Sequence, residues 1–223
     1  MSKITVAVIA FTLCTQAVTT VASAADTPSA PSNQPASLDI ERGKNAWVMC
    51  GTCHGEQGQG MSSIGAPALG GQSAEYLKQQ LAAYRSGTRG LDPHDVQGGR
   101  MRMLALSIPD AALVSEVAAY AATFPAARSD RSVAGNIRSG QKTYLQHCIS
   151  CHGDRAQGKP ELNAPRISGL GDRYTLDQLR LFANGRRGSS PAGVQQMTIA
   201  ARQAFQDEAA MRDVVAYLSS VGQ

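Results

Sequence analysis

Apolar side chains along this chain recur mostly with the 3.6-residue period of an α-helix. Between Ser73 and Gly87 they fall at Tyr76, Leu81 and Tyr84. Ser73 is a typical N-cap residue, and Gly87 is a typical C-terminal stop. We therefore predict a helix between these two residues.

The same pattern predicts further helices. The run 109–124 carries Leu113, Val117 and Tyr120 on one stripe, and a similar stripe near the end of the chain comprises Met211, Val214, Val215, Leu218 and Val221. Short helices are expected near 41–49 and 140–147. No segment alternates convincingly between apolar and polar residues, so we expect an all-α fold.

The second half of the chain repeats the first. At an offset of 98 residues, Tyr76 matches Tyr174, and Gln80-Leu81 matches Gln178-Leu179. Arg89-Gly90 matches Arg187-Gly188 at the same offset, which slips to 97 where Ala119-Tyr120 matches Ala216-Tyr217. We interpret the chain as a tandem duplication of a three-helix domain of about 95 residues, with one small insertion or deletion between the copies.

The N-terminus carries the only long apolar run. Lys3, the apolar stretch after it and Ala22-Ser23-Ala24 are typical of a secretory signal peptide over 1–24, with an uncleaved anchor as the alternative. A Pro- and Ser-rich arm is expected over 25–37. The two domains are then 38–124 and 136–223, joined by a polar linker over 125–135.

Four cysteines remain outside this leader, in two pairs. Cys50 and Cys53 are followed by His54, and Cys148 and Cys151 are followed by His152. Cys-x-x-Cys-His is the attachment signature of c-type haem, in which two thiols bind the vinyl groups and the histidine binds the iron. Two disulfides and a zinc site are the alternatives, but zinc needs four ligands close together and the pairs lie 98 residues apart.

The composition agrees with two bound haems. Only 5% of the residues are aromatic, although aromatic side chains usually supply much of a buried core. A covalently bound porphyrin would supply the missing apolar surface. The formal charge of +4 becomes +3 without Lys3, and four haem propionates bring the total close to zero. Nucleic-acid binding is therefore not expected.

Two Cys-x-x-Cys-His domains, each with an Ala-Pro-x-x-x-Gly segment after the motif, resemble the dihaem cytochromes of the c4 type. A Tyr-x-x-x-Gln-Leu helix and a closing Ala-Tyr helix strengthen the resemblance, which covers residues 38–223. The resemblance implies a tandem class I cytochrome c fold that carries electrons in the periplasm. It also implies histidine and methionine as axial ligands of each iron.

The resemblance assigns His54 and His152 as the histidine ligands. Met101 is preferred to Met103 as the methionine of the first copy, because it lies seven residues before Ile108, and Met197 is expected in the second copy. The carbonyls of Pro67 and Pro165 would accept hydrogen bonds from the two histidines, or these prolines simply turn the chain. Arg89 and Arg187 either pair with haem propionates or are ordinary surface charges.

We therefore expect a periplasmic dihaem c-type cytochrome that transfers single electrons and is not an enzyme. Its expected donor is a quinol-oxidising complex or a dehydrogenase, and its expected acceptor is a terminal oxidase or reductase. A permanent cytochrome subunit of a larger dehydrogenase complex is the first alternative. A dihaem enzyme, such as a peroxidase or thiosulfate dehydrogenase, is the second. A peripheral membrane association stays open.

Overall fold

Side-chain caps determine where the helices of the first repeat begin. In the computed structural model, which describes residues 39–128, 130–187 and 192–221, this repeat contains α1 (Ile40–His54), α2 (Ala74–Ser86), α3 (Val96–Leu106) and α4 (Ala111–Ala121). The carboxylates of Asp39, Asp95 and Asp110 and the Ser73 hydroxyl each accept a hydrogen bond from an amide of the first turn. Gly87 ends α2 in the left-handed conformation, with φ of 80°.

The second repeat has the same order of elements. It contains α5 (Ile137–His147), α6 (Ile149–His152), α7 (Asp172–Ala183), α8 (Ala192–Ala204) and α9 (Glu208–Val221). Short 3₁₀ segments, η1 (Ser62–Ile64) and η2 (Pro160–Leu162), lie at equivalent places in the two repeats. The described residues contain no strand, only isolated bridges, so the all-α prediction is confirmed.

The helices predicted from apolar periodicity are all present, but each repeat has one more long helix than expected. These are α3 and α8, which carry the candidate methionine ligands. Gly98 and Gly99 lie inside α3, and glycine disfavours a helix interior by about 1 kcal/mol relative to alanine. The helix propensity of this segment therefore did not predict α3, which its cap and its packing stabilise.

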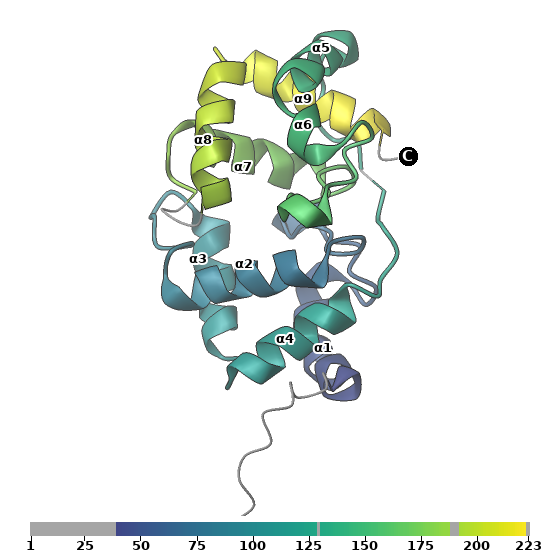
Figure 1. The fold of residues 1–223 in the computed structure, drawn as a ribbon, viewed down its shortest axis with the longest axis vertical. Helices are drawn as coiled ribbons and strands as arrows, with labels where there is room; N and C mark the ends of the chain where they lie inside the picture. The colour runs from purple at the N-terminus through teal and green to yellow at the C-terminus, as the bar shows by residue number, and fades with distance from the viewer. Residues whose placement is uncertain (1–38, 129, 188–191, 222–223) are drawn as a thin grey trace, which may run out of the picture. The chain divides into compact units, whose positions relative to one another are not determined.

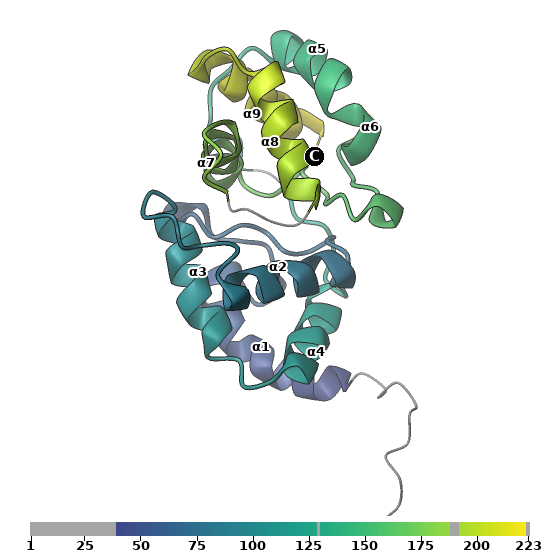
Figure 2. The same ribbon diagram turned by 60° about the vertical axis from the view of Figure 1, so that its left-hand side comes forward.

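The first and last helices of each repeat cross at a glycine. α1 packs against α4, and α5 packs against α9. A Cβ atom on Gly43 would collide with the carbonyl of Glu116, and a Cβ on Gly140 would collide with that of Asp213. Figures 1 and 2 show α1–α4 gathered in one half of residues 37–223 and α5–α9 in the other. Both halves belong to a single compact unit.

The apolar core differs in size between the repeats. In the first, the fully buried cluster consists only of Trp47, Leu77, Ala118 and Ala121. In the second, the cluster is larger and includes Tyr144, Phe205 and the inner face of α9. Tyr84 and Val117 of the first repeat are buried as well but lie outside this cluster.

The segment expected as a linker contacts both halves. A Cβ atom on Gly70 of the first repeat would collide with the Pro125 carbonyl, and the amide of Val133 donates to the Asp172 carboxylate of the second repeat at 3.0 Å. The predicted signal peptide, 1–24, and arm, 25–37, lie outside the described residues. Among the described helices, none alone is long and apolar enough to cross a membrane; α3 and α4, bent by 119°, meet that test only as a pair.

Candidate functional site

The first Cys-x-x-Cys-His motif occupies the last turns of α1. Cys50, Cys53 and His54 are all helical, so the two thiols are presented about one turn apart. In the second motif the helix breaks at Cys148, between α5 and α6, while Cys151 and His152 lie in α6. All four thiols are free, so the disulfide alternative is wrong for this structure.

Both histidines are buried and held by a carbonyl. His54 Nδ1 donates to the Pro67 carbonyl at 2.8 Å, and His152 Nδ1 donates to the Pro165 carbonyl at 2.9 Å. Burial lowers the pKa of both histidines below the usual value, against the opposing effect of these hydrogen bonds. A neutral imidazole whose Nδ1 carries the proton keeps its Nε2 lone pair available to a metal.

The cysteine thiols that begin the two motifs are also shielded from water. Burial raises the pKa of Cys50, and it raises the pKa of Cys148 to about 11. Such thiols are protonated and weakly reactive at neutral pH.

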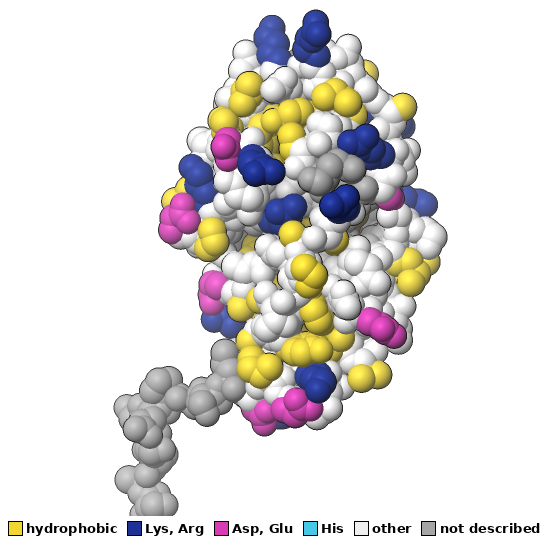
Figure 3. Space-filling view, turned by 90° about the vertical axis from the view of Figure 1, so that its right-hand side faces the viewer, with side chains coloured by type: hydrophobic (Ala, Val, Ile, Leu, Met, Phe, Trp, Pro, Cys, Tyr) yellow, Lys and Arg dark blue, Asp and Glu magenta, His cyan; other side chains and the backbone are white. Residues whose placement is uncertain are grey.

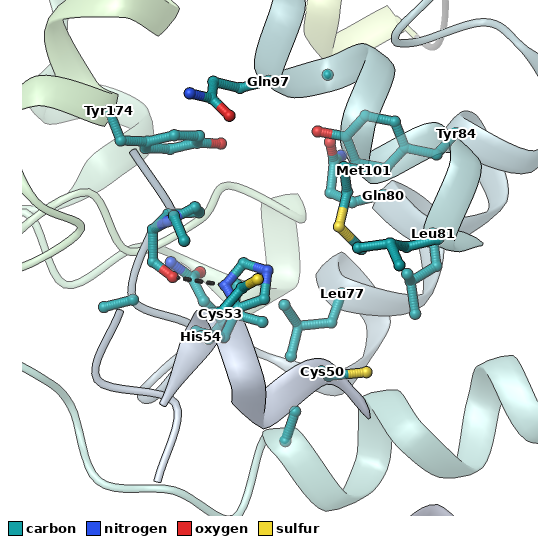
Figure 4. A pocket seen from close by; sticks show the side chains of 18 of the residues that line it. Cys50, Cys53, His54, Leu77, Gln80, Leu81, Tyr84, Gln97, Met101 and Tyr174 are labelled. Carbon is teal, nitrogen blue, oxygen red and sulfur yellow. Dashed lines mark hydrogen bonds between the residues drawn. The ribbon is translucent and has the colours of Figure 1, made fainter. Parts of the chain in front are cut away.

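The first motif opens into a large cavity. This cavity encloses about 1240 Å³ when its open mouth is included, and its walls hold Cys50, Cys53, His54 and Met101. Figure 4 shows the Met101 sulfur, from α3, and the His54 ring, from α1, pointing into the same space. Met103 is 67% exposed and is not part of the wall, so the geometry favours Met101.

Burial along α3 and α8 aligns the two candidate methionines. Ala105 and Ala201 each lie four residues after Met101 and Met197, and their exposed fractions are 0% and 2%. Two residues after each methionine, Met103 and Ile199 are both exposed. The two helices therefore match at an offset of 96, and the expectation of a single insertion between copies is wrong. The register changes on both sides of the methionine.

Several lining residues come from the other repeat. Leu170, Tyr174 and Gln178 of the second repeat form part of the wall around His54 and Met101. Sequence reasoning found Tyr174 and Gln178 only as repeated positions and assigned them to a helix. Their recurrence was the available signal, but recurrence does not reveal that a residue faces the other copy.

The residues present fit a covalently attached haem. The cavity offers two thiols, a neutral histidine and a thioether, surrounded mainly by apolar side chains. Its wall also holds Arg89, which is 5% exposed and whose Nε has no hydrogen-bond partner among the described residues. Arg187 is 4% exposed, so the view of these arginines as surface charges is wrong. An unpaired buried cation at the wall suits a ligand that carries carboxylates.

Comparison with known proteins identifies both repeats. The cytochrome c family model matches residues 40–121 and again 137–222. The thiosulfate dehydrogenase electron acceptor of Stutzerimonas stutzeri is 30% identical over 80% of this chain and 81% of its own length. Cytochrome c4 of Azotobacter vinelandii is 26% identical over 79% of this chain and 88% of its own length.

A solved structure extends this match to three dimensions. The cytochrome c4 structure of Acidithiobacillus ferrooxidans superposes with a TM-score of 0.63 and 28% identity, over 78% of this chain and 99% of that one. Two domain matches along the chain account for two covalently bound haem c groups. The chain therefore belongs to the cytochrome c family, as a dihaem electron-transfer protein of the c4 type.

Proposed function

We propose that this dihaem cytochrome carries single electrons in the periplasm between a donor complex and an acceptor complex. The observation that carries the proposal is the cavity in which His54 and Met101 face the same space. Two axial protein ligands leave an iron no position for a substrate, which favours a carrier over an enzyme. A bound haem supplies a one-electron iron couple, whose potential methionine ligation raises relative to a second histidine.

We assign the site residues by domain. Cys50 and Cys53 would attach the first haem, and His54 and Met101 would bind its iron. In the second domain the corresponding set is Cys148, Cys151, His152 and Met197. The carbonyls of Pro67 and Pro165 hold the two imidazole rings in orientation through the Nδ1 hydrogen bonds.

The organisation of the chain belongs to the same proposal. Residues 1–24 direct export and are cleaved, and 25–37 form an arm. The haem domains are 38–124 and 136–223, and the segment 125–135 joins them. The family match over 40–121 and 137–222 supports these bounds.

The donor in this proposal is a dehydrogenase or a quinol-oxidising complex, and the acceptor is a terminal oxidase or reductase. The relative that is 30% identical is named as an electron acceptor of thiosulfate dehydrogenase, which supports a dehydrogenase as donor. The same name supports the second candidate function, a lasting cytochrome subunit of a dehydrogenase complex. Size-exclusion chromatography of the native extract separates the two: a carrier elutes alone, and a subunit elutes with its dehydrogenase.

Carbon monoxide binding to the reduced holoprotein tests the ligand assignment. We expect no carbon monoxide complex in the wild type and about one per chain in Met101→Ala or in Met197→Ala. Met103→Ala is the matched control, because it removes an exposed thioether two residues away. Binding by the wild type at one haem would favour an enzyme, and binding by Met103→Ala would overturn the choice of Met101.

A further inference from the structure

A buried carboxylate lies directly behind the wall of the first cavity. Asp95 is 3% exposed and caps α3, the helix that carries Met101. Asp95 Oδ1 accepts from the Gly98 amide at 2.8 Å, and Gly98 belongs to the cavity wall. Met101 follows Gly98 by three residues, so the two lie on the same face of the helix. The carboxylate is therefore fixed next to the first site.

The described residues do not neutralise the charge of Asp95. None of the ion pairs among them includes Asp95, and its Oδ2 has no hydrogen-bond partner there. A Cβ atom on Gly98 would collide with Oδ2, so the missing side chain at this position makes room for the carboxylate. The N-terminus of a helix stabilises a negative charge. A buried charge is screened less than an exposed one, so its field reaches farther.

Two tyrosines of the cavity wall are within reach of this charge. Burial raises the pKa of Tyr84, and the charge of Asp95 raises it further. Against burial and Asp95, Arg89 and Arg187 lower the pKa of Tyr174. Both tyrosines border the space shown in Figure 4, so the field of the carboxylate extends into the cavity of the first site.

The buried arginines do not distinguish the two sites, because they recur in both domains. Arg89 Nη2 donates to Gln178 Oε1 at 3.2 Å, and Arg187 Nη2 donates to Gln80 Oε1 at 3.4 Å. The two arginines are 98 residues apart, and so are the two glutamines. Each contact is therefore the counterpart of the other, and each arginine reaches into the other domain.

Asp95 has no such counterpart. α3 and α8 match at an offset of 96, which aligns Asp95 with Pro191, and the segment 188–191 contains no Asp or Glu. Two arginines of α3 also lack a counterpart in α8, but Arg100 is exposed and Arg102 is half-buried. Solvent screens such charges more than it screens a buried carboxylate. The acid is therefore the buried charge that separates the first site from the second.

We propose that Asp95 tunes the first haem alone, by lowering its reduction potential and leaving that of the second haem nearly unchanged. A nearby negative charge favours ferric over ferrous iron, because the oxidised site carries one more positive charge. Asp95 is a positioning residue that acts through space and is not a ligand. The inference rests on the proposed function in placing the first haem between His54 and Met101.

The test is Asp95→Asn in the holoprotein. Asparagine keeps a side-chain oxygen for the Gly98 amide and is as good an N-cap as aspartate, so the variant removes the charge and retains the cap. A redox titration follows the haem-methyl NMR signals of each haem, which are assigned by their change in Met101→Ala or Met197→Ala. We expect a higher potential at the first haem. The equilibrium constant for electron exchange between the haems should shift on the order of tenfold toward a reduced first haem.

Three further variants accompany it. Asp95→Glu keeps the charge and alters the cap, so the potential should stay close to that of the wild type. Asp92→Asn removes the same charge from the same loop, where the side chain is 29% exposed and pairs with His94 at 3.0 Å, so its effect should be smaller. Asp95→Ser, another neutral cap, replaces Asp95→Asn if that variant does not retain both haems.

Several results would overturn the assignment. An unchanged first potential in the neutral variants would show that the carboxylate does not act on the iron, and equal rises at both haems would show that it is not selective. An equal rise in Asp92→Asn would remove burial as the cause. Carbon monoxide binding by Asp95→Asn would make Asp95 a structural support of the Met101 ligand. The haem content and carbon monoxide resistance of the wild type test the proposed function separately, so the two failures are distinguishable.

Discussion

At the scale of single residues, Trp47 and Tyr144 make equivalent contacts in the two domains, although one side chain is an indole and the other is a phenol. Trp47 Nε1 donates to the Glu56 carbonyl at 3.0 Å, and the Tyr144 hydroxyl donates to the Gly153 carbonyl at 2.5 Å. Each ring also packs on a tyrosine of the last helix, Tyr120 or Tyr217. In both domains one aromatic side chain thus joins the first helix, the last helix and the loop after the haem-binding histidine.

Removing one of these polar contacts should destabilise the second domain. Tyr144 is fully buried, so Tyr144→Phe leaves the Gly153 carbonyl without that partner and should lower the free energy of unfolding by about 1–2 kcal/mol. Tyr120→Phe is the control, because the Tyr120 hydroxyl makes no hydrogen bond to the described residues, and its effect should be smaller. Denaturant unfolding of the holoprotein measures both; equal losses would contradict this account.

The residues that do chemistry were accessible from the sequence to different degrees. The cysteines and histidines follow from one contiguous motif, so their identification needs no tertiary information. The choice between Met101 and Met103 depends on which side of α3 faces the cavity. Two residues apart on a helix means nearly opposite faces, and only packing decides between them.

At the scale of secondary-structure elements, glycines in α1 and α3 differ in how closely other backbone atoms approach them. Gly43 in α1 lies where the backbone of α4 crosses, and a Cβ there would meet the Glu116 carbonyl. Gly99 in α3 has open space, with only the Gly90 carbonyl within 3.9 Å of a Cβ. The sequence pattern predicted α1 but not α3. Gly98 and Gly99 disfavour a helix, so local propensity did not indicate α3, although Asp95 caps it.

Matched alanine substitutions test whether Gly43 and Gly99 differ in this way. Gly43→Ala should lower the free energy of unfolding by about 1–3 kcal/mol, because α1 and α4 must move apart. Gly99→Ala should raise it by about 1 kcal/mol, because alanine favours the helix and meets no close atom. Thermal unfolding of the two holoproteins is the measurement. Destabilisation of similar size in both would show that the crossing at Gly43 is not the cause.

At the scale of the whole molecule, charge is divided unequally between the domains. Residues 136–223 contain 11 Lys and Arg against 7 Asp and Glu, whereas 38–124 contain 7 against 8. On the face in Figure 3, Lys and Arg side chains gather over the half that holds α5–α9, whereas apolar side chains lie over both halves. The net charge of the whole chain does not reveal this division. The two domains therefore suit partners that differ in charge.

This division predicts that an acidic redox partner docks on the second domain. Lys142→Glu with Arg155→Glu should slow electron exchange with a strongly acidic redox protein, and Lys44→Glu in the first domain should not. The effect should fade as ionic strength rises from about 0.01 to 0.1 M, because the screening length falls from about 30 to 10 Å. Stopped-flow rates measure it; equal slowing by Lys44→Glu would contradict a preference for the second domain.

The contact between the domains shows where sequence reasoning stops. The repeat revealed Gln80, Arg89 and their counterparts as recurring positions, and helical periodicity gave most of each domain. Neither reveals that a position in one copy touches its counterpart in the other, because both describe one copy at a time. Such a relation exists only in the assembled pair.

The crossed arginine–glutamine contacts have the form of a two-fold axis. In a symmetric dimer, a donor on one subunit meets an acceptor on the other, and the reverse contact repeats across the axis. Arg89 with Gln178, and Arg187 with Gln80, repeat this arrangement within a single chain. One copy therefore carries both sides of its own complementary surface. Two separate copies of a domain that carried this arginine and this glutamine would present complementary surfaces to each other.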